Sequence, residues 1–196
     1  MPIKGLADLI PDVSSGTATI DPNKILATVL QKYPRLANVN DPSNTQAIFS
    51  SPERTKLAGD RQLEYWPAQE PGTPDFPNPS PGKITLEIYN NELRQNPQLL
   101  ENAIYGDLLH GLRNDKTFDL LRHEFKSGFM PETIDFEKRN GFDEMDDSRL
   151  DAYIRGALAP DKNNEFMLNQ EKSGNVYSDK QMRILEIMKK YLGSKE

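Results

Sequence analysis

The sequence contains no cysteine and only two histidines among its 196 residues. The absence of cysteine excludes disulfide bonds, thiolate metal sites and cysteine nucleophiles, and it fits a protein made in a reducing cytoplasm. Because histidine is also scarce, any metal chemistry would have to depend mainly on carboxylates.

Long apolar runs are missing as well. The apolar fraction is 36% and the mean hydropathy is -0.72, and no stretch approaches the roughly 18 to 20 apolar residues that span a bilayer. Residues 1–16 contain one lysine and no apolar run of seven, so we expect no secretory signal. The net charge of -6 repels nucleic acid and anionic membranes. We therefore expect a soluble, acidic protein with neither nucleic-acid nor membrane partners.

The chain is long enough to bury a real core, and its composition changes along its length. Its 12 glycines and 15 prolines indicate that part of it forms arms or loops. Prolines interrupt residues 1–60, for which we predict an N-terminal arm with short helices. Residues 61–196 are predicted to form a mainly helical domain.

The best helix of the first region is "DPNKILATVLQKYP", residues 21–34. Asp21 can cap it, Pro22 suits its first turn and Pro34 ends it. Its apolar side chains recur at helical spacing. We expect this face to pack on the protein's own core, and a partner surface is the alternative.

Two strands are predicted in residues 62–90, from "QLEYW" and "KITLEIYN". The second alternates Ile84, Leu86 and Ile88 with more polar residues, which is typical of a strand with one buried face. The predicted fold class is therefore α+β, mainly helical. A small antiparallel two-stranded element with a long connection packs on a helical C-terminal half.

The connection between these strands, residues 67–82, holds six prolines in sixteen residues. It can be neither helix nor central strand, because proline lacks a donor and biases the preceding residue toward extended geometry. We predict an extended, polyproline-like loop. It is either a solvated linker or a stiff segment that lies against a partner protein, with Phe76 as the anchoring side chain.

From residue 96 onward the chain is predicted to be helical, with Asn96, Asp115 and Ser178 as caps. A polar bridge over residues 159–175 precedes the last helix. That helix has a wide apolar arc of Met182, Ile184, Leu185, Ile187, Met188, Tyr191 and Leu192. Such a helix is either clasped between neighbours, which we expect, or docked on another subunit.

Asp107 and His110 lie inside the apolar arc predicted for residues 99–112. Three positions apart, they can touch, and an ionised aspartate favours a protonated imidazole. In a structural interpretation, Asp107 orients His110 within a scaffold. In a chemical interpretation, both belong to a metal or acid–base site completed by His123 and Glu124.

The predicted strand "KITLEIYN" is followed by a turn and then by the helix that bears "GDLLH". This order resembles that of the strand and active-site helix of zincin metallopeptidases. Gly106 stands where that family has its first histidine ligand, and Asp107 stands where it has its general-base glutamate. His123 projects away from the apolar face of its own helix. The nucleotide-binding, serine-hydrolase and EF-hand patterns are absent, and "DFEKRNGFDEMDD" fits a solvated acidic loop better than a calcium site. We expect no catalytic residue, metal site or cofactor, and keep a zincin-like metallopeptidase or cell-wall hydrolase as the alternative.

Four segments carry a second resemblance: "LEYWPAQEPGTPDFPNPSPGKITLEIYN", "AIYGDLLHGL", "LDAYIRGALAPDKNNEF" and "VYSDKQMRILEIMKKYL". Their order is similar to that of uncharacterised proteins encoded near virion genes of tailed bacteriophages, over about residues 63–192. The resemblance implies a phage setting and carries no activity. The expected function is a non-enzymatic structural or accessory virion component, located in the virion and, during assembly, in the host cytoplasm.

The expected partners are other virion proteins, with copies of the chain itself among them. Tyr65, Trp66, Phe76 and Tyr89 are the predicted partner-binding residues, because exposed aromatics beside prolines give contact area at low entropy cost. A small phage regulator that binds a host protein is a further alternative with the same acidic surface.

Overall fold

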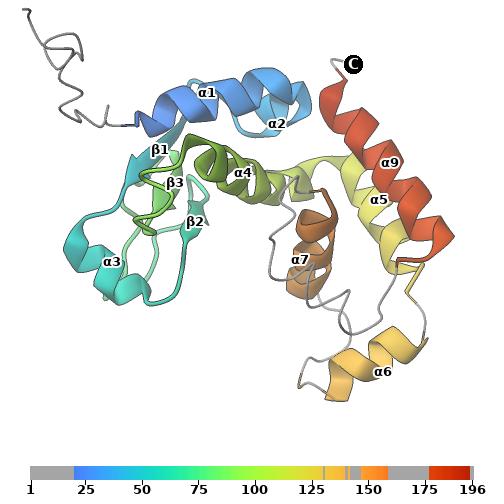
Figure 1. The fold of residues 1–196 in the computed structure, drawn as a ribbon. Helices are drawn as coiled ribbons and strands as arrows, with labels where there is room; N and C mark the ends of the chain where they lie inside the picture. Colours follow the sequence, from blue (N-terminus) through green and yellow to red (C-terminus); the bar gives the residue numbers. More distant parts are fainter. Residues whose placement is uncertain (1–19, 130, 140, 142–146, 159–176, 195–196) are drawn as a thin grey trace, which may run out of the picture.

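The structure is a computed structural model that describes residues 20–129, 131–139, 141, 147–158 and 177–194. Helices dominate these residues and three short strands form one sheet, so the mainly helical α+β prediction is confirmed. In Figure 1 the sheet and α3 lie at one end and α5 and α9 at the other, with α4 between them. The predicted arm before residue 20, the polar bridge over residues 159–175 and residues 140 and 142–146 of the acidic segment lie outside the described residues.

The first described helices are α1 (Pro22–Lys32) and α2 (Pro34–Val39). The Asp21 carboxylate accepts a hydrogen bond from the backbone N–H of Asn23, and α1 ends just before Pro34, as predicted. Pro34 also begins a second helix, which the sequence analysis does not predict. Leu26 and Val29 of α1 are buried in the same core as the residues of α4. This confirms that the apolar face of α1 packs on the protein's own core; the domain boundary near residue 60 stays a prediction.

The sheet contains β1 (Thr45–Phe49), β2 (Leu63–Trp66) and β3 (Ile84–Ile88), in the order β1-β3-β2. The predicted antiparallel pair exists, with Tyr65 opposite Leu86, but β1 adds a third strand parallel to β3. The two-stranded prediction is wrong because β1 joins the sheet by pairing with a strand about 39 positions away, which no local pattern reveals. A helix, α3 (Pro52–Ala58), connects β1 to β2.

As the central strand, β3 is buried on both faces. Thr85 and Glu87 are as inaccessible as Leu86 and Ile88, so the prediction of one buried face is wrong for this strand. The sequence alternates because one face packs on apolar side chains and the other on a polar network. That network includes Gln46, which donates to the Thr85 hydroxyl.

The proline-rich connection folds back on itself by turns instead of running extended as predicted. Its centre is Asn78, which is 4% exposed. The Asn78 amide nitrogen donates to the carbonyl oxygens of Pro67 and Glu70, and its side-chain oxygen accepts from the N–H of Ser80. Gly72, with φ of 75°, is required because a β-carbon there would lie 2.5 Å from the Phe76 carbonyl oxygen. The connection is thus a packed part of the fold.

The C-terminal half consists of α4 (Pro97–Leu108), the 3-10 helix η2 (Leu109–Asn114), α5 (Lys116–Lys126), α6 (Pro131–Arg139), α7 (Asp147–Leu158) and α9 (Asp179–Gly193). The predicted caps are confirmed: the side chains of Asn96, Asp115 and Ser178 each accept from backbone N–H groups of the first turn. Side-chain capping satisfies donors that the helix itself leaves unpaired.

The last helix, α9, is held between α2, α5 and α7, so the prediction that it is clasped by neighbours is confirmed. Its buried side chains include Leu185 and Met188. The predicted apolar arc includes Met182 and Ile187, but these side chains are 48% and 51% exposed. Gln181 takes the buried position instead, where its amide donates to the Phe125 carbonyl oxygen.

Candidate functional site

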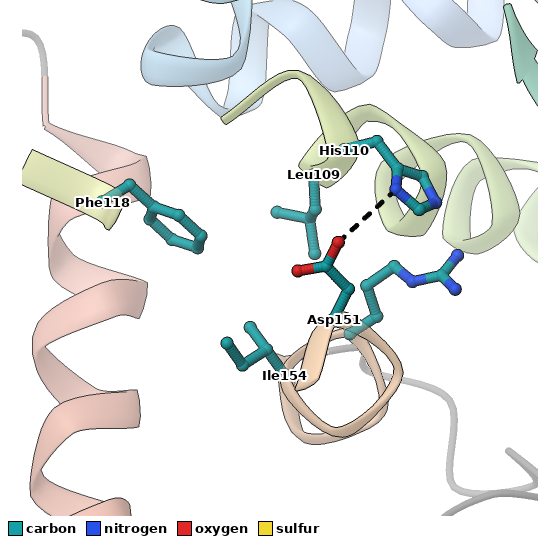
Figure 2. A pocket seen from close by; sticks show the side chains of 6 residues that line it. Leu109, His110, Phe118, Asp151 and Ile154 are labelled. Atoms are coloured by element: carbon teal, nitrogen blue, oxygen red, sulfur yellow. Dashed lines mark ion pairs between the residues drawn. The ribbon is translucent and has the colours of Figure 1, made fainter. Parts of the chain in front are cut away.

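Asp107 and His110 lie where α4 tightens into η2, and both face α7. The His110 Nε2 atom is 3.6 Å from Asp107 Oδ1, which confirms that the two side chains are adjacent. On its other side, the imidazole Nδ1 atom lies 3.8 Å from Oδ2 of Asp151, a residue of α7 (Figure 2). The imidazole therefore stands between two carboxylates that come from different helices.

Arginine side chains bind both of these carboxylates. Arg155 Nη1 lies 3.3 Å from Asp107 Oδ1. Arg122 donates from Nε and Nη2 to Asp151 Oδ1, at 3.1 and 2.7 Å. Arg113 donates from Nε to Asp151 Oδ2 at 2.7 Å, with a second contact from Nη2. Asp151 is thus shared by guanidinium groups of η2 and α5, which ties α7 to both.

The sequence prediction missed Asp151 and all of these arginines, although a signal was present. Arg122 lies four residues after Phe118 and three before Phe125, so it occupies the apolar face of α5. Asp151 precedes Ile154 by three residues and shares its buried face of α7. A buried arginine and a buried aspartate on neighbouring helices are expected to pair, since an unpaired buried charge is costly.

The protonation states differ from the sequence-based expectation of an ionised aspartate beside a protonated histidine. Burial raises the pKa of Asp107 to about 7, although the charge of Arg155 opposes this. Burial also lowers the pKa of His110 to about 4, with Arg155 acting in the same direction and Asp151 against it. For both side chains, burial outweighs the effect of the neighbouring charges and favours the neutral form.

Beside this cluster is a small space lined by Leu109, His110, Phe118, Asp151, Ile154 and Arg155 (Figure 2). The space is about large enough for one water molecule. Ordinary ligand pockets, at roughly 300 to 1,000 Å³, are far larger.

The structure does not join His123 and Glu124 to Asp107 and His110. The His123 side chain is 68% exposed, and its Nε2 atom is 3.6 Å from Asp119 Oδ2. Glu124 forms an ion pair of 3.2 Å with Lys180 of α9. In the part of the chain that the structure describes, no three histidine, aspartate or glutamate side chains form a group that could hold a metal ion.

Of the four aromatic residues predicted to bind a partner, Trp66 is 4% and Tyr89 is 1% exposed. The expectation that they are exposed is therefore wrong for these two, because the folded proline-rich connection covers this region. Tyr65 is half-buried, and its hydroxyl donates to Asn40 Oδ1 at 2.9 Å. A role of any of the four in partner binding stays a prediction.

Phe76 is half-buried and packs within its own chain. Its ring lies 5.7 Å from that of Trp66 and 6.1 Å from that of Tyr89, between centroids. The guanidinium carbons of Arg54 and Arg61 lie 4.5 and 5.3 Å from its ring centroid. These contacts fix the proline-rich connection to α3 and the sheet.

A second polar cluster surrounds Glu87 at the centre of the sheet. Arg54 donates from Nε and Nη2 to the two carboxylate oxygens at 2.6 and 2.7 Å. The hydroxyls of Ser50 and Tyr89 donate at 2.7 and 2.9 Å. Burial alone would raise the pKa of Glu87, but these hydrogen bonds hold that pKa below its usual value. This cluster fastens α3 to β3.

Comparisons with protein-family models, with curated proteins and with solved structures give no match. Among the described residues, no helix combines the length and the hydropathy needed to cross a bilayer. Function must therefore be argued from the residues themselves.

Proposed function

We propose that this protein is a non-enzymatic structural or accessory component of a tailed-phage particle that works through protein–protein contacts. The supporting observation is the way in which the cluster around Asp107 and His110 is paired. A general acid or base must face the substrate proton that it transfers. Here the oxygens of Asp107 and Asp151 face guanidinium groups of their own chain.

The position of these pairs supports a scaffold role. Asp107 with Arg155 links α4 to α7, and Asp151 with Arg122 links α7 to α5. Removing one partner from a buried ion pair is far more costly than the net gain from forming it. The cluster therefore enforces one arrangement of these helices, which suits a protein that presents a fixed surface.

Exposed apolar side chains supply candidate contact area. In the described residues the large ones are Leu57 on α3, Leu120 on α5, and Met182 and Ile187 on α9. Large apolar side chains at the surface are typical of protein contact sites when they are grouped. Tyr65 and Phe76 keep part of their surface exposed and remain candidates.

The phage setting is supported by the sequence resemblance over about residues 63–192. The test is mass spectrometry of purified particles from a phage or prophage that encodes this chain. We expect the protein in particles purified through a density gradient, at a constant ratio to the major capsid protein. Its presence in infected-cell lysate but absence from particles would overturn the proposal and favour a regulator of a host protein.

A further inference from the structure

The exposed face of α5 carries a self-complementary pattern. Lys116, Leu120 and Glu124 are spaced four residues apart, so they follow one another along one side of the helix. All three are exposed: Leu120 at 67%, the Glu124 side chain at 65%, and Lys116 with them. A basic, an apolar and an acidic residue thus form one short stripe with the apolar residue at its centre.

The neighbouring helix α9 extends this surface. Lys180 near the start of α9 pairs with Glu124 near the end of α5, and Tyr191 near the end of α9 donates to Asp115 at the start of α5. The two helices are therefore antiparallel, and they lie side by side at one end of the molecule (Figure 1). Ile187 lies seven residues after Lys180 and four before Tyr191, so this exposed side chain shares their side of α9.

We infer that this outer face of α5 and α9 binds a second copy of the same chain. In a two-fold arrangement with the α5 helices antiparallel and the axis beside Leu120, each Lys116 faces the Glu124 of the other copy. That carboxylate has two oxygens, so it can accept from this Lys116 as well as from Lys180 of its own chain. The two leucines then meet at the axis. A two-fold interface requires a patch that is complementary to itself, and a basic–apolar–acidic stripe meets that requirement.

The size of the patch requires both helices. With 11 residues, α5 is only about 16 Å long. A standard interface buries roughly 800 Å² on each partner, so the outer side of α9, including Arg183 and Ile187, must contribute. Opposite charges at the ends of the stripe select the antiparallel register and disfavour a parallel one. This inference does not depend on the phage setting.

The first test is the mass of the full chain in solution, measured by sedimentation equilibrium over a range of concentrations. We expect a monomer–dimer equilibrium, which Leu120→Glu should shift to monomer by at least tenfold in the dissociation constant. Leu57→Glu is the matched control, since Leu57 is equally exposed but lies on α3 at the other end of the molecule. A chain that stays monomeric at all concentrations would overturn the inference, as would a dimer disrupted only by the control.

The second test exchanges the charges. Lys116→Glu and Glu124→Lys should each weaken the dimer by about tenfold, because each places like charges opposite one another twice. An equimolar mixture of these two variants should associate again, since every facing pair is then of opposite charge. Failure of the mixture to associate, or a dimer unaffected by either variant, would refute the antiparallel arrangement.

Discussion

Asp107 on α4 and Arg155 on α7 are 48 residues apart in the sequence, yet Arg155 Nη1 lies 3.3 Å from Asp107 Oδ1. This contact joins two helices that otherwise meet over a small area. Because both side chains are partly shielded from water, the attraction between them is stronger than that of an exposed pair. The polar residues among the leucines of α4 thus position α7.

At pH 8, where Asp107 is mostly ionised, Arg155→Met should lower the free energy of unfolding by about 1 to 3 kcal/mol, because Asp107 would lose the guanidinium that compensates its partly buried carboxylate. Urea denaturation followed by circular dichroism measures this. Lys56→Met, at an exposed position of α3, is the control for loss of one positive charge. Equal stability of both variants would show that the contact does not hold α7.

The proton of the Asp107 and His110 pair is expected to move on folding. Burial raises the pKa of Asp107 from 3.8 to about 7 and lowers that of His110 from 6.5 to about 4. Between about pH 4 and pH 6.5, the folded state therefore holds a proton on Asp107, whereas the unfolded chain holds one on His110. The two contributions to the pH dependence of the free energy of unfolding therefore oppose each other in the wild-type protein.

Single substitutions should reveal these opposed contributions. In Asp107→Asn only His110 remains; its contribution is present above pH 6.5 and is lost as the pH falls through about 4. In His110→Asn only Asp107 remains; its contribution is present below pH 3.8 and is lost as the pH rises through about 7. Urea denaturation at several pH values should give differences from wild type with slopes of opposite sign. Slopes of the same sign would contradict the proposed protonation states.

Glu87→Ala should destabilise the sheet by about 3 kcal/mol, because it leaves the Arg54 guanidinium and the buried Ser50 hydroxyl without their acceptor. The Tyr89 hydroxyl keeps its hydrogen bond to Glu64. The measurement is again the free energy of unfolding. Glu186→Ala, which removes an exposed carboxylate of α9, should leave stability unchanged. A small effect of Glu87→Ala would mean that water replaces the carboxylate.

Trp66→Ala should destabilise the protein by about 3 to 5 kcal/mol, as expected for truncation of a buried aromatic side chain. Phe76→Ala should cost less, because its ring is only half-buried. Thermal unfolding of both variants gives the comparison. Any test of these residues in partner binding must therefore use variants shown to be folded, and a Trp66→Ala protein as stable as wild type would refute the packing described here.

Added zinc should leave the thermal unfolding midpoint unchanged, because guanidinium groups surround the carboxylates near His110 and repel a cation. The control is Arg155→Met, which removes one of these positive charges. Calorimetric titration of the chelator-free protein with zinc gives a direct measurement. Tight binding by the wild-type chain would favour the metallopeptidase alternative.

The sequence predicted those parts of the fold that depend on neighbouring residues. Asn96, Asp115 and Ser178 cap helices because their side chains reach backbone N–H groups two or three positions ahead. The adjacency of Asp107 and His110 also follows from helical spacing alone. The strand β1 was missed because its pairing with β3 joins residues 39 positions apart, as in the contact between Gln46 and Thr85.

Sequence patterns alone predicted several helix caps and the antiparallel pair of β2 and β3, and they excluded cysteine chemistry. Only the tertiary structure decided that Arg113, Arg122 and Arg155 meet Asp107 and Asp151, that Trp66 and Tyr89 are covered, and that Leu120 remains exposed. Local backbone preferences act over a few residues, so the local sequence is enough to predict them. Charge pairing and burial depend on which helices come together, and that is set by the packing of the whole core.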